Sequence, residues 1–326
     1  MAREIAVASG KGGVGKSTVS STLLLALHRA GWKVVGVDAD ADAPNLHLIF
    51  GMEKWELERD FEEGFIASIV RERCTECGVC AEVCPFDAVE VVGGMHVINP
   101  MVCEGCATCI LACPEKAILR RRTVRGRLRW GRTKYGFPLA GARLNPGRPN
   151  SGRLVEEVKV MSRRLGGDDA VYIVDSAAGI GCQVISSLAG ANAAVLVAEP
   201  TPSSFSDLKR VHTVAMGFGL PSALIVNKWD LNPAMAEEIE EYGKRENMHI
   251  LGRIPYDPAV PKSMSMMVPL IEAFPDSPAS KALKEISEEF LEEIMGNWDE
   301  WRFKHAPRRI PQYRPIIIKP EGLGGP

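Results

Sequence analysis

The sequence predicts an α/β fold, in which a mostly parallel sheet carries helices on both faces and a small α+β domain is inserted. Short apolar runs typical of buried strands alternate with longer segments of helical periodicity along most of the 326 residues. Eight of the nine cysteines gather between residues 74 and 113, where this alternation stops. A compact cysteine-rich unit therefore interrupts a larger domain.

The main domain begins with an expected strand at residues 3–8, a helix at 16–30 and a strand at 33–38. The later elements are expected in this order: helix 152–165, strand 170–175, strand 193–198, helix 203–217, strand 222–227, helix 233–246, strand 249–254 and helix 278–297. Strands separated by helices pair in parallel, and such sheets bind ligands at the carboxyl ends of their strands.

Five segments follow from this pattern. They are the first part of the main domain at 1–69, the cysteine-rich insert at 70–119, a basic connecting arm at 120–153, the second part of the main domain at 154–304 and an extended tail at 305–326. The net charge of −2 and the hydrophobic fraction of 46% are ordinary for a globular protein. No N-terminal export segment and no run of 18 apolar residues occurs, so we expect a cytoplasmic protein.

The cysteines form two copies of the pattern C-x2-C-x2-C-x3-C-P, and the second copy lies 29 residues after the first, as Cys103 follows Cys74. At this spacing three thiolates surround one iron–sulfur cube and the fourth reaches the neighbouring cube, as in two-cluster ferredoxins. The sequence therefore predicts two 4Fe–4S clusters. One is expected on Cys74, Cys77, Cys80 and Cys113, and the other on Cys103, Cys106, Cys109 and Cys84.

Zinc and disulfide bonds are the alternatives for a cysteine-rich unit. Structural zinc sites use two separated pairs of ligands, and disulfides are typical of secreted chains. Two tight groups of four cysteines, each followed by a proline, match the iron–sulfur pattern better than either alternative.

A glycine-rich loop follows the first expected strand and precedes the first expected helix. Its glycines let backbone N–H groups turn toward phosphate oxygens, and the helix N-terminus adds partial positive charge. Lys16 is expected to neutralise the β- and γ-phosphates, and Ser17 to coordinate Mg²⁺. The residues expected to bind the nucleotide here are Gly10, Lys11, Gly12, Gly13, Val14, Gly15, Lys16, Ser17 and Thr18.

Lys11 indicates which class of phosphate-binding loop this is, because ordinary loops of this kind accept almost any residue at its position. With Lys11 the loop resembles the deviant loop of the MinD/ParA ATPases, in which this lysine contacts the phosphates bound by the other subunit of a nucleotide-sandwich dimer. The resemblance implies a homodimer in which Lys11 and Lys16 are both catalytic. A solvated loop lysine is the alternative role for Lys11.

Acidic residues follow two of the expected strands. By resemblance to switch I of that family, Asp40 positions the attacking water and Asp38 lies on the magnesium side, while Asp42 leaves open which carboxylate acts. Asp175 is similar to the Walker B aspartate of the family and is expected to hold Mg²⁺ through water. Capping of strand ends is the alternative role for Asp38 and Asp175.

The segment Asn227-Lys228-Trp229-Asp230 matches N-K-x-D, which recognises guanine in many GTPases. In MinD/ParA relatives the asparagine contacts adenine, so we expect ATP, with GTP as the alternative. Pro255 lies in a segment similar to the loop that covers the base in that family. Asn227, Lys228 and Pro255 are therefore the expected base-site residues.

The basic connecting arm has no acidic residue between Lys116 and Val155, but it has eleven arginines and lysines. It is either an edge strand with solvated arginines or a docking surface for an acidic partner or polyanion. No nucleic-acid motif accompanies it, so nucleic acid is not an expected partner. Cys182, the ninth cysteine, is either a buried small residue or a thiol at an interface that moves with the nucleotide.

Together these features resemble a MinD-type ATPase with an inserted two-cluster ferredoxin domain over nearly the whole chain. The leading hypothesis is that ATP binding and hydrolysis in a dimer gate electron transfer from the clusters to a redox partner. The alternative is a carrier or scaffold that assembles iron–sulfur or other metal cofactors. A spatial-positioning ATPase on a membrane is disfavoured, because the polar face of the last expected helix is acidic and anionic lipid would repel it.

Overall fold

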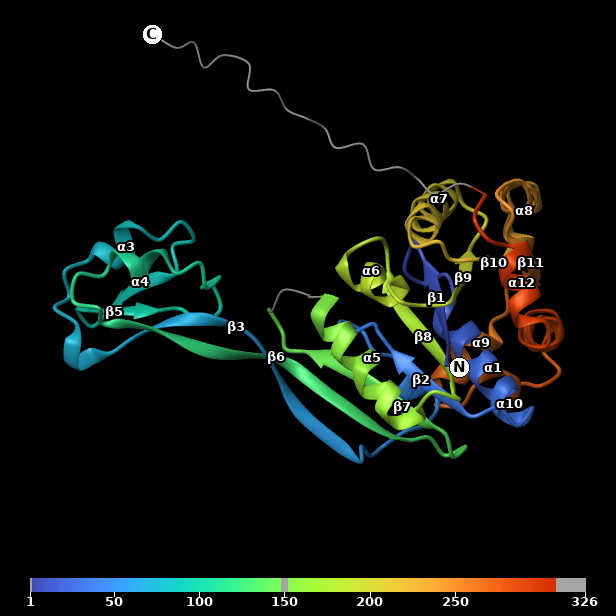
Figure 1. Cartoon of the computed structure of the whole chain (residues 1–326), viewed down its shortest axis with the longest axis horizontal. Coiled ribbons are helices and arrows are strands. Elements are labelled where there is room, and N and C mark those ends of the chain that lie inside the picture. Colours follow the sequence, from blue (N-terminus) through green and yellow to red (C-terminus); the bar gives the residue numbers. More distant parts are fainter. Residues whose placement is uncertain (1, 148–151, 309–326) are drawn as a thin grey trace, which may run out of the picture.

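The main domain is built on a nine-stranded sheet with the order β11-β10-β9-β1-β8-β2-β7-β6-β3 (Figure 1). The structure is a computed structural model that describes residues 2–147 and 152–308. Neighbours from β11 to β7 pair in parallel, whereas β7–β6 and β6–β3 are antiparallel. The strands are β1 (Arg3–Ser9), β2 (Val34–Asp38), β3 (Leu57–Ile69), β6 (Ile118–Arg132), β7 (Pro138–Leu144), β8 (Val171–Ala178), β9 (Ala193–Ala198), β10 (Ser222–Asn227) and β11 (His249–Ile254).

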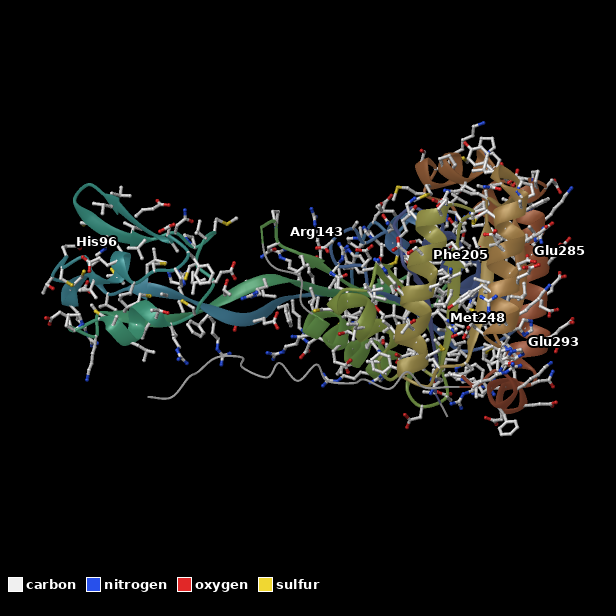
Figure 2. All side chains as sticks on the ribbon, turned by 90° about the horizontal axis from the view of Figure 1, so that it is seen from above. His96, Arg143, Phe205, Met248, Glu285 and Glu293 are labelled. Carbon is white, nitrogen blue, oxygen red and sulfur yellow. The ribbon has the colours of Figure 1, made fainter. Side chains whose placement is uncertain are left out.

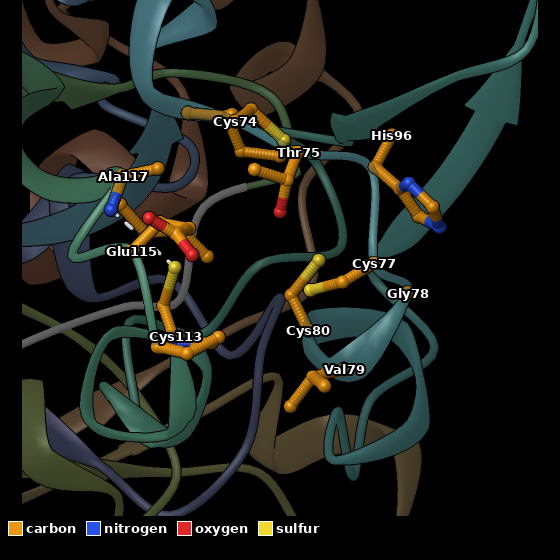
Figure 3. A pocket seen from close by; sticks show the side chains of 13 residues that line it. Cys74, Thr75, Cys77, Gly78, Val79, Cys80, His96, Cys113, Glu115 and Ala117 are labelled. Carbon is orange, nitrogen blue, oxygen red and sulfur yellow. Dashed lines mark hydrogen bonds between the residues drawn. The ribbon is translucent and has the colours of Figure 1, made fainter.

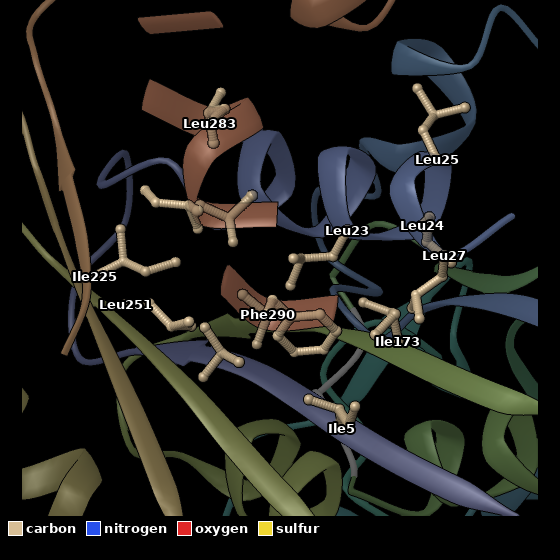
Figure 4. Close-up of a cluster of buried hydrophobic side chains, with 14 of the residues drawn as sticks. Ile5, Leu23, Leu24, Leu25, Leu27, Ile173, Ile225, Leu251, Leu283 and Phe290 are labelled. Atoms are coloured by element: carbon tan, nitrogen blue, oxygen red, sulfur yellow. The ribbon is translucent and has the colours of Figure 1, made fainter. Parts of the chain in front are cut away.

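Helices cover both faces of the sheet and bury a core on each. One face carries α1 (Lys16–Arg29), α9 (Ala259–Ser265), α10 (Leu270–Ala273), α11 (Pro278–Glu289), a π-helix (Phe290–Met295) and α12 (Trp298–Lys304). The other face carries α5 (Gly152–Gly166), α6 (Cys182–Leu188), α7 (Pro202–Gly217) and α8 (Pro233–Arg245). Alternation along β1 explains the division, since Ile5 joins the first core and Ala6 the second. Figure 4 shows Ile5 beneath Phe290 in the first core.

The predicted fold class is confirmed for the main domain, which is a mostly parallel α/β sheet with helices on both faces. The expected helix at 278–297 is divided, because α11 ends at Glu289 and the π-helix follows. Of the expected tail, residues 309–326 lie outside the described residues. No helix of the described chain is long and apolar enough to cross a membrane.

Strands β3 and β6 form a long two-stranded ribbon that extends away from the sheet (Figure 1). Their pairing runs from Leu57 opposite Trp130 to Ile69 opposite Ile118. The insert, residues 70–117, lies at the far end of this ribbon. It contains a 3-10 helix (Arg71–Arg73), α3 (Val79–Glu82), β4 (Val89–Val92), β5 (Met95–Ile98) and α4 (Thr108–Ala112).

The segment expected as a basic arm contributes β6 and β7 to the main sheet. The acidic edge strand β3 pairs with β6, and its carboxylates balance several of the arginines. Arg127 lies 2.6 Å from Glu58, and Arg122 lies 3.5 Å from Glu62. Part of the basic charge is therefore neutralised within the chain, and docking of an acidic partner on the remaining arginines stays a prediction.

Candidate nucleotide site and cysteine cavities

The carboxyl ends of β1, β8 and β2 meet at one edge of the sheet. The parallel register sets Asp175 beside Val7 on one side and beside Asp38 on the other. The glycine-rich loop joins β1 to α1 at this edge, as the sequence predicts. Gly15 has a φ of +101°, and a Cβ there would lie 2.4 Å from the side-chain nitrogen of Asn227, so only glycine fits.

Lys16 is buried at the start of α1, and its Nζ donates to Ser9 Oγ at 3.0 Å. Burial lowers the pKa of Lys16, while the carboxylates of Asp175 and Asp40 act to raise it. The structure thus brings three predicted residues, Lys16, Asp175 and Asp40, close enough for their charges to interact. Ser9 was not predicted, since a serine at a strand end carries no signal of its own.

Asp175 and Asp38 are both almost fully buried. Burial raises the pKa of Asp175 to about 6, although hydrogen bonds from Ser17 and Ser20 oppose this rise. The pKa of Asp38 is raised well above its ordinary value, first by burial and then by the charge of Asp175. A divalent cation beside both carboxylates would offset this cost. The pair, together with Ser17, therefore fits the oxygen ligands that Mg²⁺ prefers.

Asp38 also shapes the loop that follows β2. Its two carboxylate oxygens accept hydrogen bonds from Asp40 N at 3.3 Å and from Leu46 N at 3.0 Å. Residues 39–45, the switch loop, are thereby held between β2 and the short helix α2 (Leu46–Ile49). Asp38 serves as a strand-end cap here, which is compatible with a position on the magnesium side.

Asp40 lines a cavity of about 400 Å³ together with Asp42, Ala178, Cys182 and Gln183. Asp42 accepts a hydrogen bond from Gln183 Nε2 at 3.3 Å, so α6 holds this carboxylate. The charge of Asp40 instead acts on Lys16 and Asp175, and it acts to raise the pKa of both. Cys182 is exposed at this cavity, and the interpretation as a buried small residue is wrong.

Lys11 forms an ion pair within its own chain. Its Nζ lies 3.0 Å from Glu199 Oε1, and Lys228 Nζ lies 3.0 Å from Glu199 Oε2. Burial acts to raise the pKa of Glu199, but the hydrogen bonds from Lys228 and Lys11 outweigh it, so the pKa is lowered. Glu199 was not predicted from the sequence. The available signal was its position directly after the apolar strand β9, which is like the position of Asp38 after the apolar residues of β2.

Asn227 and Lys228 contact the glycine-rich loop. Asn227 Nδ2 donates to Val14 O at 2.7 Å, and Lys228 Nζ donates to Gly13 O at 3.1 Å. Asp230 accepts a hydrogen bond at 2.7 Å from the backbone N–H of Tyr256, the residue that follows Pro255. The predicted base-site residues therefore lie together at the nucleotide edge, where Asn227 and Lys228 also hold the loop.

The eight cysteines of the insert line two separate cavities. The first is lined by Cys74, Cys77, Cys80 and Cys113, and Figure 3 shows their side chains around one space. The second is lined by Cys84, Cys103, Cys106 and Cys109. Each group takes three cysteines from one copy of the repeat and the fourth from the other, which is the grouping that the cluster prediction requires.

The repeat is visible in the backbone as well. Left-handed conformations recur at three pairs of positions that are 29 residues apart: Glu76 and Gly105, Gly78 and Ala107, and Asp87 and Lys116. The last cysteine of each copy accepts the same hydrogen bond, from Ala88 N to Cys84 Sγ at 3.3 Å and from Ala117 N to Cys113 Sγ at 3.3 Å. Backbone turns and N–H groups thus orient the thiols in both copies.

The crowding of thiols fits a bound cationic centre. The pKa of Cys109 is raised to about 11, first by burial and then by the charges of the other cysteines of its cavity, Cys103, Cys106 and Cys84. Four thiolates in such a space need positive charge to remain ionised, which the iron of a cluster supplies. Within residues 2–147 and 152–308 no three His, Cys, Asp or Glu side chains converge on a single-ion site.

Comparisons with known proteins agree with the fold and the nucleotide edge. A septum site-determining protein MinD with Mg-ADP from Pyrococcus horikoshii has a TM-score of 0.56 at 21% identity, covering 91% of this chain and 98% of that chain. An uncharacterized protein of Methanocaldococcus jannaschii is 33% identical over 292 residues, covering 89% of this chain and 97% of that protein. An iron-sulfur cluster carrier protein of Pyrococcus abyssi is 25% identical over 305 residues, covering 89% of this chain and 86% of that protein.

The family model for the CobQ/CobB/MinD/ParA nucleotide binding domain matches residues 5–270. The matched range includes the glycine-rich loop and the aspartates at the strand ends. The chain therefore belongs to the CobQ/CobB/MinD/ParA family of nucleotide-binding proteins.

Proposed function

We propose that this protein hydrolyses ATP in a nucleotide-dependent homodimer and couples this reaction to electron transfer by two 4Fe–4S clusters held in the insert. One observation carries the proposal. The ribbon that holds the two cysteine cavities begins after the switch loop and returns through β7, the neighbour of β2. The same strands therefore connect the cysteines with the nucleotide edge.

The residues at the sheet edge suit phosphoryl transfer. Lys16 supplies positive charge to the phosphates, while Ser17 and the buried Asp175 and Asp38 would hold Mg²⁺. Asp40, at the cavity beside α6, would orient the attacking water. Lys11 would act from the partner subunit after leaving Glu199, and its positive charge would stabilise the charge that develops in the transition state.

Contacts at the base of the ribbon provide a route for coupling. Leu144 N donates to Ala41 O at 3.0 Å, which ties the end of β7 to the switch loop. Gly141 of β7 pairs with Asp38 of β2. A rearrangement of the switch loop on nucleotide binding or hydrolysis would therefore displace β7 and β6, and with them the insert.

The cysteines of the insert would hold the clusters as resident groups. Bound 4Fe–4S clusters supply one-electron oxidation and reduction. Cys80 and Cys109 are each 8% exposed, so the protein encloses part of each ligand set. Enclosed ligands favour retention of a cluster over its release.

The alternative function is assembly or delivery of iron–sulfur clusters. It is favoured by the name of the Pyrococcus abyssi relative, which is an iron-sulfur cluster carrier protein. A carrier must release its cluster to a client. Release would require opening of cavities whose cysteines come from both copies of the repeat.

Iron retention during turnover tests the proposal against this alternative. Full-length protein purified without oxygen should hold about eight irons per chain, by the two-cluster rule. We expect this iron to remain bound through many rounds of MgATP hydrolysis in the presence of an apo-ferredoxin. Transfer of iron to the apo-protein in step with hydrolysis would support the carrier, and two zinc ions in place of iron would overturn the cluster assignment.

A further inference from the structure

A second polar pocket lies where the ribbon joins the main sheet, apart from both sites described above. It has a volume of about 300 Å³ and is lined by Glu58, Arg127, Arg129, Arg143, Leu144, Asn145 and Pro146. We call it the arginine pocket. Figure 2 shows Arg143 between the insert, marked by His96, and the helical body, marked by Phe205.

Strand register explains why the arginines share one face. Arg127 of β6 lies opposite Arg143 of β7, and Arg129 lies opposite Gly141 on one side and Glu58 on the other. Directly opposed residues, and residues two apart on one strand, point to the same side of a sheet. Gly141 has no side chain, and a Cβ there would lie 3.2 Å from Asp38 Cβ, so Asp38 borders this face beside Arg129.

Arg129 is a buried cation without an acceptor. It is 8% exposed, and its Nε is buried with no hydrogen-bond partner. Among the described residues its guanidinium forms no hydrogen bond or ion pair, and it lies over the Trp55 ring, 4.4 Å from the ring centroid. A buried charge of this kind is costly unless a partner of opposite charge is supplied.

The pocket has an excess of positive charge. Arg127 is neutralised by Glu58 at 2.6 Å, whereas Arg129 and Arg143 have no ion-pair partner in the part of the chain that the structure describes. The excess is felt by His47, whose pKa is lowered to about 4 by burial and then by these two arginines. Burial lowers the pKa of Arg129, and the charges of Asp38 and Glu58 act to raise it, although neither carboxylate forms an ion pair with it among the described residues. Two guanidinium groups without an ion-pair partner match a ligand that carries two negative charges.

We propose that the arginine pocket binds a small dianion through Arg129 and Arg143, either a phosphate group or a dicarboxylate. Guanidinium groups bind the oxygens of both kinds of anion in forked geometry. The site is separate from the glycine-rich loop, but the neighbouring Leu144 is hydrogen-bonded to Ala41 of the switch loop. An occupied pocket would therefore stabilise one position of that loop.

The test uses full-length, anaerobically purified protein saturated with Mg²⁺ and a non-hydrolysable ATP analogue, so that the glycine-rich loop is filled. Inorganic phosphate and malonate are titrated separately by calorimetry, which distinguishes the two kinds of anion. We expect one of them to bind with a measurable Kd that weakens about tenfold or more in Arg143→Gln, since a charged hydrogen bond is lost. Arg122→Gln, a matched ribbon arginine outside the pocket, should leave the Kd within about twofold.

Thermal unfolding gives a second readout that does not depend on nucleotide turnover. The favoured anion should raise the Tm of the native protein by a few degrees but leave Arg129→Met unshifted, because binding stabilises only a protein that has the site. If Arg129→Met fails to fold, the shift in Tm and the Kd of Arg143→Gln serve as the test instead. The proposal is overturned if neither anion binds at millimolar concentration, or if Arg122→Gln weakens binding as much as Arg143→Gln.

Discussion

The nucleotide edge and the cysteine cavities are built in opposite ways. The nucleotide edge collects residues from Lys11 to Asn227, and the ends of strands anchored between two large cores hold them in place. The cysteine cavities use one short stretch of chain, and the hydrophobic cluster beside them has four buried members, Ala67, Cys80, Cys109 and Ile118. Two of these four are themselves expected ligands. The protein thus preorganises the first site, whereas we expect the stability of the second to depend on a bound cluster.

Removal of one ligand from the insert should have the largest effect. In Cys80→Ser we expect loss of about four of about eight irons, and loss of hydrogen-exchange protection across the insert, because cluster binding and folding are coupled there. Nucleotide binding should persist, since the main cores are untouched. Cys182→Ser is the matched control and should retain all iron. Full iron in Cys80→Ser would contradict the assignment of this ligand.

A substitution at the nucleotide edge should remove chemistry without removing structure. Lys11→Ala should lower the rate of ATP hydrolysis about 100-fold, because a positive charge at the transition state is lost. Nucleotide affinity of the monomer should change little, since Lys11 is held by Glu199 there. Rates and binding are measured in parallel with Lys33→Ala, which removes a surface ion pair with Asp169. Unchanged turnover in Lys11→Ala would show that this lysine has no catalytic role.

We expect one part of the pH dependence of folding stability to come from His47 in α2, next to the switch loop. His47 has a folded-state pKa of about 4, lowered from 6.5 by burial and by Arg129 and Arg143. Between these values the unfolded chain binds a proton at His47 that the folded protein excludes, so the contribution of His47 to stability falls as the pH falls from about 6.5 to 4. After a discount for partial exposure we expect a loss of about 2 kcal/mol. Asp175, whose folded-state pKa is raised to about 6, acts in the opposite sense and stabilises the folded protein as the pH falls. Urea unfolding of both proteins should therefore show the native protein losing stability relative to His47→Gln over this range.

The smallest effect is expected at Glu199, which holds Lys11 within its own subunit. Glu199→Gln removes the ion pair and should strengthen ATP-dependent dimerisation about two- to fivefold, since partly exposed ion pairs contribute about 0.2–1 kcal/mol. Sedimentation velocity with an ATP analogue measures the dimer constant, with Glu289→Gln as a surface control. A weaker dimer would mean that Glu199 positions Lys11 for its partner instead of restraining it.

Short-range patterns in the sequence predicted the glycine-rich loop and the grouping of the cysteines. Both are set by local spacing, as the recurrence of left-handed backbone at Glu76 and Gly105 illustrates. Most buried strands and helices were also predicted, because their apolar periodicity is strong. The ligand roles of the cysteines and of Asp38, Asp40 and Asp175 remain predictions.

Features that depend on long-range register were not predicted. Strand β3 carries charged residues on both faces, and its partner β6 follows only after the whole insert. Glu199 gains its role from Lys11, which lies far from it in the sequence but 3.0 Å from it in space. The surroundings of Arg129 likewise depend on the register, which sets Gly141 opposite it on one side and Glu58 on the other. No local pattern could indicate these pairings.

The midpoint potential of the clusters, with and without a non-hydrolysable ATP analogue and Mg²⁺, tests the central claim most directly. If the nucleotide edge and the insert are coupled through the ribbon, the analogue must shift the potential, and nucleotide affinity must differ between oxidised and reduced protein by the matching factor. A tenfold difference in affinity corresponds to a shift of about 59 mV for a one-electron couple. Identical potentials in both conditions, together with iron transfer to an apo-protein, would contradict the account and favour the carrier.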